Sequence, residues 1–209
     1  LITAFNASPF PRSEVLTAVV DVPPCGASRE FDLLAADGKQ HVPAQVVTRR
    51  PHYATVNHAG DAAHMMQCEQ VVFHFEAGDL PALGYTTFRF NPKGRFARGG
   101  LACGSNAMEN EHLHVVIRDN GTLTVHHKAS GTVFEGLHFF EDSGEAGQAW
   151  MHVEPGADTV VSSRGFPVSV SLEEDGALLA RYRIEHFLKI PAGLDNAGSN
   201  AWERLDGFD

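Results

Sequence analysis

"LHVVIRDNGTLTVHH", residues 113–127, sets two runs of alternating apolar and polar residues on either side of a turn sequence. The arrangement predicts an antiparallel hairpin, in which the length of the loop decides which side chains share a face. A two-residue loop at 120–121 would place polar groups of the second run against the core. A three-residue loop at 119–121, with Gly121 left-handed, groups apolar residues with apolar residues. The pattern favours this second register, whose core-facing residues are Leu113, Val115, Ile117, Leu123, Val125 and His127.

Short runs of the same β-type recur along the chain, separated by turn sequences such as "AADGK", "KASGT" and "EEDGA". No segment keeps an apolar period of 3.6 residues over three turns, so helices are not expected. Strands at this spacing are typical of β-sandwiches, and the sequence predicts an all-β fold. The other predicted strands are "VLTAVVDV" (15–22), "QHVPAQVVT" (40–48), "EQVVFHFEA" (69–77), "YTTFRF" (85–90) and "ARYRIEHFLKI" (180–190).

A stretch rich in Gly, Arg and Asn, "NPKGRFARGGLACGSNAMEN" (91–110), interrupts this series of strands. We interpret it as a linker or a long exposed loop between two β units.

The composition excludes several classes of partner. The 209 residues carry a formal net charge of -10, and no basic cluster is longer than Arg49–Arg50, so neither nucleic acid nor a membrane is expected as a partner.

The three cysteines, Cys25, Cys68 and Cys103, are far apart and are interpreted as reduced, packed thiols. There is no long apolar run, basic leader or initiating Met, so we expect a cytoplasmic protein and interpret the chain as an excised piece.

The predicted hairpin register also places His112, His114 and His126 on the outer face, with His114 opposite His126. Imidazoles at alternate strand positions can converge on a zinc ion. No carboxylate at a fixed spacing completes the set, and twelve histidines in the chain produce such groups by chance. The prediction is therefore that this chain binds no metal.

The stretch "FFEDSGEAGQAW" (139–150) sets Glu141, Asp142 and Glu145 among glycines and ends on Trp150. Two carboxylates can act as the proton donor and the nucleophile of a glycosidase, but acids beside glycines are more often solvated turn residues. Trp150 and Trp202 would stack on sugar rings or pack in a core. Because two glycines and three acids disfavour a buried strand, we expect residues 142–150 to be exposed, with Trp150 partly accessible. No serine-nucleophile motif, phosphate loop or dinucleotide fingerprint is present, since "GRFARGG" lacks the strand-to-helix context and the lysine.

Residues 106–150 resemble the C-terminal region of the α-mannosidases of glycosyl hydrolase family 38. There an "EN" entry, a strand, an "NGTL" hairpin, a "K-x-[ST]-G" turn, a "fed" segment and a "GDxGDxY" loop follow one another in this order. Upstream, "FNASPFPRSEVL" (5–16) and "DLPALGYTTFRF" (79–90) resemble the family's "FN-x-L-x-[WF]-x-R" and "lPalGY" segments, and "LLARYRIEHFLKIP" (178–191) resembles a later strand.

The resemblance implies a small β-sandwich at 1–95, a linker at 96–107 and, at 108–209, the first part of a larger sandwich with the galactose mutarotase fold. It places the zinc-dependent retaining catalytic domain, with its zinc ligands and aspartate nucleophile, upstream of Leu1. This chain would then be an inactive accessory fragment without a cofactor, whose partners are the catalytic domain of the same parent chain and a mannose-containing glycan.

The resemblance also implies a substrate-binding loop, because the family's "GDxGDxY" segment aligns with residues 144–150 here. Its acids and tyrosine correspond to Glu145, Gln148 and Trp150, which are the expected substrate-binding residues of this chain. No catalytic residue is expected in it. The alternative function is a free-standing carbohydrate-binding or adhesion module that uses exposed aromatic side chains.

Overall fold

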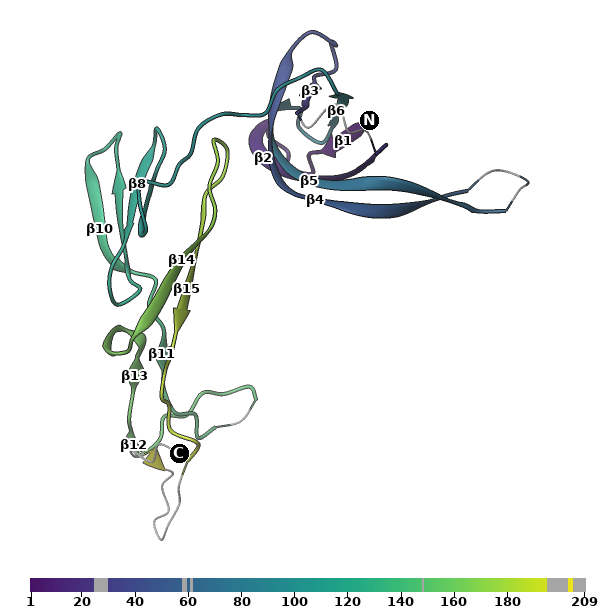
Figure 1. The fold of residues 1–209 in the computed structure, drawn as a ribbon. Coiled ribbons are helices and arrows are strands. Elements are labelled where there is room, and N and C mark those ends of the chain that lie inside the picture. The colour runs from purple at the N-terminus through teal and green to yellow at the C-terminus, as the bar shows by residue number, and fades with distance from the viewer. Residues whose placement is uncertain (25–29, 58–59, 61, 148, 195–202, 205–209) are drawn as a thin grey trace. The chain divides into compact units, whose positions relative to one another are not determined.

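The computed structural model describes residues 1–24, 30–57, 60, 62–147, 149–194 and 203–204. Its strands are joined into antiparallel sheets, apart from one short parallel pair, which confirms the predicted all-β fold (Figure 1). Two compact units are formed by residues Leu1–Leu101 with Glu174–Arg181, and by Ala102–Glu173 with Tyr182–Asp209. The described residues include no helix that is long and apolar enough to cross a membrane.

The first unit is one six-stranded antiparallel sheet in the order β1-β6-β3-β4-β5-β2. Its strands are β1 (Ile2–Phe5), β2 (Arg12–Val22), β3 (Asp32–Leu34), β4 (His41–Val56), β5 (His64–Leu80) and β6 (Tyr85–Asn91). Along β5 the alternate residues Val71, Phe73, Phe75 and Ala77 are all buried, as the period of two in a strand requires. They form the core with Phe31, Leu33, Leu80 and Phe88.

Strands β4 and β5 extend well beyond the predicted runs 40–48 and 69–77. They pair with each other from Ala44↔Phe75 to Val56↔His64, whereas β2 accompanies β5 only as far as Val22↔Glu69. The outer part is therefore a two-stranded ribbon, and the polar "RRPH" sequence inside β4 gave no indication of it.

The segment 91–110, which the sequence analysis interpreted as a linker or a long exposed loop, is in part attached to the first unit. Phe96 packs against the core, and Ala97 donates a backbone hydrogen bond to Ala44.

The second unit contains a four-stranded sheet in the order β10-β9-β8-β7 and three two-stranded sheets, β11-β13, β12-β16 and β14-β15. The strands are β7 (Ala107–Glu109), β8 (Leu113–Ile117), β9 (Leu123–His127), β10 (Thr132–Leu137), β11 (Glu141–Asp142), β12 (Ala157–Asp158), β13 (Val161–Ser162), β14 (Val168–Glu174), β15 (Arg181–His186) and β16 (Glu203–Arg204), with a 3-10 turn at Ser163–Gly165. Ile117 and Val161 are its buried apolar residues among those described. The bounds of the two predicted sandwich domains stay a prediction.

The hairpin of β8 and β9 has the predicted register. Ile117 pairs with Leu123, and His114 pairs with His126. Gly121 has a φ of 78°, in the left-handed region, and its N–H donates to the carbonyl of Arg118 at 2.9 Å. The three-residue loop at 119–121 is thus confirmed.

The cysteine prediction is confirmed only in part. Cys68 is a buried free thiol, while Cys103 is a free cysteine that is exposed, contrary to the prediction of a packed side chain. Cys25 and Trp202 lie outside the described residues.

Candidate functional site: the Gly144–Val153 loop

The segment from Gly144 to Val153 forms a loop between β11 and β12, and its base is attached to neighbouring strands. Glu141 and Asp142 of β11 pair with Ser162 and Val161 of β13. The Gly144 N–H donates to Asp158 Oδ2 at 2.8 Å. Because Glu141 and Asp142 are adjacent on a strand, their side chains point to opposite faces, and they do not form the paired carboxylates of a glycosidase.

Glu145 organises the inside of the loop. Its Oε1 accepts hydrogen bonds from the N–H groups of Gly147 at 2.7 Å and Val153 at 2.9 Å, and its Oε2 pairs with His152 Nδ1. The Ala146 N–H also donates to the Val153 carbonyl at 2.9 Å. The carboxylate that the resemblance assigns to substrate is thus engaged by its own loop, and its assignment as a substrate ligand stays a prediction.

These contacts shift two pKa values. The N–H of Val153, then His152 and the N–H of Gly147, stabilise the carboxylate and lower the pKa of Glu145. The hydrogen bond and charge of Glu145 raise the pKa of His152 above its ordinary value of 6.5. Nothing in the sequence pointed to His152, because a Glu and a His seven residues apart in a loop follow no recognised spacing.

Gly147 is required by the close approach of the two sides of the loop. A Cβ on this residue would overlap with the carbonyl oxygen of Met151 and would lie 2.7 Å from Glu145 Oε1. The glycine therefore allows the loop to close around Glu145.

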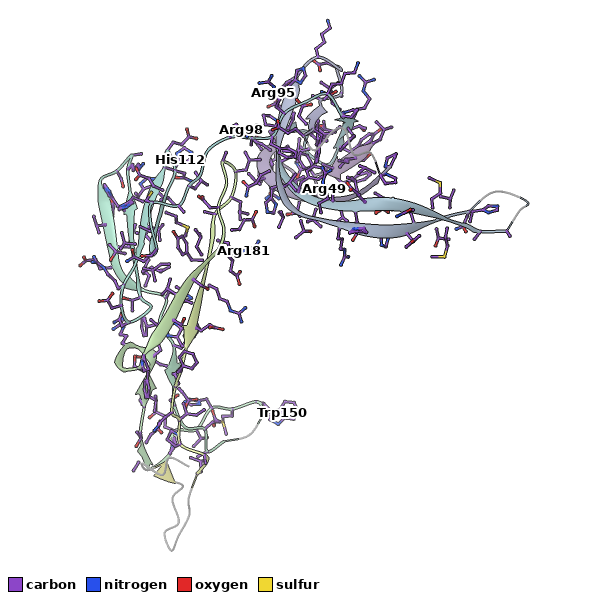
Figure 2. All side chains as sticks on the ribbon, viewed as in Figure 1. Arg49, Arg95, Arg98, His112, Trp150 and Arg181 are labelled. Atoms are coloured by element: carbon purple, nitrogen blue, oxygen red, sulfur yellow. The ribbon has the colours of Figure 1, made fainter. Side chains whose placement is uncertain are left out.

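Trp150 lies near the end of this closed loop and is 90% exposed, as the sequence analysis expected of the loop. Its indole stands clear of the ribbon in Figure 2. Met151 beside it is 64% exposed. Gln148, the third expected substrate-binding residue, lies outside the described residues. An exposed indole has an apolar face and an N–H donor with which it can contact a ligand or a partner.

Beside the loop lies a hollow of about 360 Å³, lined in part by His152, Glu154 and Asp158. Carboxylates and an imidazole offer hydrogen-bond partners for hydroxyl groups. The loop and the hollow together are the candidate functional site of the second unit.

The three outer histidines are not brought together as one set. His114 and His126 are cross-strand neighbours, whereas His112 precedes β8 and its Nε2 lies 3.2 Å from Glu111 Oε1. Across the part of the chain that the structure describes, no group of three or more His, Cys, Asp or Glu side chains could hold a metal ion. The absence of metal in solution stays a prediction.

The fluorescence of Trp150 is expected to be readily quenched by acrylamide, because the indole is 90% exposed. The measurement is made in a Trp202→Phe background, so that Trp150 is the only tryptophan. A quenching constant close to that of free tryptophan is the expected result. A constant typical of a buried indole would contradict this placement.

The internal hydrogen bonds of the loop are expected to be strongest between about pH 4.5 and 6.5. The raised pKa of His152 means that its contribution is complete below 6.5 and is lost as the pH rises through the raised value. The lowered pKa of Glu145 means that its contribution is complete above 4.5 and is lost as the pH falls through the lowered value. Amide-exchange protection of Gly147 and Val153, corrected for intrinsic rates, measures this window. His152→Asn should remove the loss on the alkaline side only, and an unchanged profile in that variant would refute the assignment.

Comparisons with known proteins show which fold this chain shares. No protein-family model matches the sequence. A curated protein of Halalkalibacterium halodurans named "Putative mannosylglycerate hydrolase" is 28% identical over 100 residues, which are 48% of this chain and 11% of that protein. The crystal structure of an α-mannosidase from Enterococcus faecalis V583 superimposes on 99% of this chain with a TM-score of 0.78 and 19% identity. The chain has the fold of part of a glycosyl hydrolase family 38 α-mannosidase.

A second solved structure, a protein in glycosyl hydrolase family 38 from Enterococcus faecalis, covers 93% of this chain with a TM-score of 0.75 and 20% identity. The resemblance drawn from the sequence motifs is thereby confirmed. This chain spans 27% and 25% of the lengths of the two solved chains. The activity and the substrates of a whole family 38 enzyme are therefore matters of proposal for this chain.

Proposed function

We propose that this chain is an accessory β-sandwich region of an α-mannosidase-like glycoside hydrolase, and that its Gly144–Val153 loop contacts the sugar bound at the catalytic domain. The fold likeness to family 38 α-mannosidases and the name of the curated relative support a hydrolase as the parent protein. The observation that carries the proposal for the loop is the exposure of Trp150 on a segment that Glu145 holds closed.

Trp150 suits this role chemically. The face of an indole packs against the C–H groups of a pyranose ring, and its N–H donates to a hydroxyl group. The family pattern has a tyrosine at the aligned position, so this chain offers a larger stacking face and an N–H donor in place of a hydroxyl. Because three hydrogen bonds to Glu145 fix the loop before any sugar arrives, little ordering is needed on binding.

The bond-breaking groups are proposed to lie on the catalytic domain of the parent protein. The resemblance implies a zinc-dependent double displacement there, with an aspartate nucleophile. The described residues of this chain do not fit such a zinc site. We therefore expect the isolated chain to show no turnover of α-mannosides.

In the complete parent protein, Trp150→Ala is expected to lower kcat/KM for an aryl α-mannoside about tenfold, since an aromatic contact contributes about 0.5–1.5 kcal/mol beyond its buried area. Trp150→Tyr, which restores the residue of the family pattern, should recover most of the loss. Phe10→Ala is the matched control, because Phe10 is 70% exposed but belongs to the first unit. Equal kcat/KM for Trp150→Ala and the parent would remove the proposed role.

The second candidate function is a free-standing carbohydrate-binding module, and the same exposed indole favours it. The two candidates differ in what the isolated chain does. A free-standing module binds mannose-containing glycans with a change in Trp150 fluorescence, whereas an accessory region shows neither binding nor turnover alone. Turnover of an aryl α-mannoside by the isolated chain, abolished by Glu145→Gln, would overturn both.

A further inference from the structure

Three aromatic rings of the second unit meet at the base of the loop. His138 follows β10, Phe140 precedes β11, and His186 ends β15. The centroid of the His186 ring lies 5.8 Å from that of His138 and 5.3 Å from that of Phe140, and the rings of His138 and Phe140 are 5.4 Å apart. The three rings are in mutual contact, and His138 and His186 are called the histidine pair below.

The imidazole of His186 has no polar partner. Both of its ring nitrogens are buried and make no hydrogen bond to any described residue. The turn at Gly121 lies against the ring, since a Cβ there would overlap with His186 Cε1 and would lie 3.0 Å from Val168 Cγ1. A buried polar group without a partner lowers the stability of the closed structure, and a charged group does so more strongly.

The described residues placed against the ring are His138, Phe140, Gly121 and Val168, and none of them carries a negative charge. The titratable group facing it is His138, whose Nδ1 lies 3.3 Å from the carbonyl oxygen of Gly121. Phe140 and Val168 contribute apolar groups. Burial of the ring and then the neighbouring His138 lower the pKa of His186 below its ordinary value of 6.5.

His138 also occupies an unusual backbone conformation. Its φ of 59° lies in the left-handed region, which a residue other than glycine adopts at a cost in free energy. Two residues later, Phe140 exchanges two hydrogen bonds with Ser163, from Phe140 N–H to Ser163 Oγ at 3.0 Å and from Ser163 N–H to the Phe140 carbonyl at 2.9 Å. Ser163 is fully buried. The histidine pair therefore packs on the attachment that fixes the start of β11, directly before the loop.

We propose that the His138–His186 pair is an acid-sensitive contact that keeps the Phe140–Ser163 attachment closed at neutral pH and releases it on acidification. Both nitrogens of His186 are buried in the closed state, so a protonated His186 gains contact with water or an anion only in an opened state. The expected motion frees the base of the Gly144–Val153 loop while Glu145 keeps the inside of the loop closed. A consequence for sugar binding rests on the function proposed above, but the contact itself does not.

The direction of the effect follows from the lowered pKa. Below about pH 6.5 His186 is protonated in the open state and stays neutral in the closed state. The equilibrium constant for opening therefore rises by up to tenfold for each unit by which the pH falls. Above this value the two states bind the same number of protons and the constant is flat. His152 in the same unit has the opposite shift, so amides inside the loop gain protection as the pH falls towards 6.5 and keep it below 6.5, where those of Phe140 and Ser163 lose protection.

Amide hydrogen exchange on the full chain between about pH 7.5 and 5.5 tests the proposal. The expected result is a roughly tenfold rise in the opening constants of Phe140 and Ser163 for each unit below 6.5, while Gly147 and Val153 gain protection between about pH 7.5 and 6.5 and keep it down to 5.5. His186→Phe keeps a ring beside Phe140 without a titrating group, and His138→Asn keeps a residue that tolerates a left-handed backbone. The first variant should abolish the dependence on pH and the second should reduce it. His112→Asn, at a histidine whose side chain is 71% exposed, is the control.

Two results would overturn the proposal. One is an unchanged pH dependence at Phe140 and Ser163 in both His186→Phe and His138→Asn. The other is a His186 imidazole that titrates at or above 6.5 in the NMR spectrum of the folded chain. Acid unfolding of the whole unit is recognised separately, because it would remove the protection of Gly147 and Val153 as well.

Discussion

Gln45→Ala is expected to lower the free energy of unfolding of the first unit by about 3–5 kcal/mol. Gln45 is buried and binds the tip of the β14–β15 hairpin, residues Glu174–Arg181, which belongs to the first unit. Its Oε1 accepts from the N–H groups of Leu178 at 2.9 Å and Leu179 at 3.0 Å, and its Nε2 donates to the Leu179 carbonyl at 2.9 Å and to Glu174 Oε1 at 2.7 Å. An alanine removes the partner of the Leu178 N–H and of the Leu179 N–H and carbonyl, at about 1–3 kcal/mol each, and because these hydrogen bonds are only partly buried each cost lies near the lower end of that range.

The hairpin tip covers a polar row that runs across three strands. Thr17 of β2 and Gln45 of β4 both pair with His74 of β5, so the three side chains share one face of the sheet. His74 Nδ1 lies 2.8 Å from Thr17 Oγ1, and its Nε2 lies 3.0 Å from Glu174 Oε1, at ion-pair distance but without the geometry of a hydrogen bond. Gln45 and His74 of this row are buried where the hairpin tip contacts them, whereas Thr17 at the end of the row is exposed. The burial of Gln45 makes its loss costly.

Gly176→Ala tests the same contact from the other side. A Cβ at Gly176 would overlap with the amide group of Gln45, so the tip must move away from the sheet. In the double variant the alanine at 45 removes the overlapping atoms. The loss of unfolding free energy in the double variant should therefore be clearly smaller than the sum of the losses in the two single variants. Gly78→Ala is the control in the same unit, because a Cβ there meets nothing within 4 Å.

Native-state hydrogen exchange of the β5 core amides of Val71 and Phe73, followed against urea, reports the first unit separately from the second. A loss below about 1 kcal/mol for Gln45→Ala, or strict additivity with Gly176→Ala, would show that the hairpin tip does not stabilise this unit.

The elements that the sequence predicted are those in which local chemistry decides the structure. The register of the β8–β9 hairpin follows from the loop at Gly121 and from the apolar residues at alternate positions 113, 115 and 117, and both signals lie within fifteen residues of each other. The exposure of Trp150 followed in the same way from glycines and acids beside it. An alternation of Val168, Val170 and Leu172 also marks β14, so that strand carried a usable signal.

Other features depend on residues far apart in the chain. Gln45 resembles any polar strand residue until Glu174, 129 residues later, lies against it. The outer half of β4 is a strand because β5 pairs with it, while its own sequence contains Pro51 and two arginines. The positive φ of His138 and the contact of its ring with His186 depend in the same way on segments that are distant in the sequence. Spacing along one sequence carries no information about such pairs.

In the complete parent protein, Gly147→Ala is expected to lower kcat/KM for an aryl α-mannoside about a hundredfold, the loss that a displacement of about 1 Å at a site can cause. The new Cβ would overlap with the carbonyl oxygen of Met151, so the two sides of the loop must separate and Glu145 must release Val153. This effect should exceed that of Trp150→Ala, because it displaces the indole and its neighbours together.

The matched control is Gly165→Ala in the same unit, where a Cβ meets nothing within 4 Å. Both variants should keep the melting temperature of the first unit, because neither residue belongs to it. Exchange of the Val153 amide should accelerate in Gly147→Ala alone, which ties the loss of turnover to the opened loop. If that amide is exposed and turnover nevertheless stays within twofold of the parent, the loop does not serve the site. That result would favour the second candidate function, a free-standing carbohydrate-binding module in which Trp150 binds a sugar away from the catalytic domain.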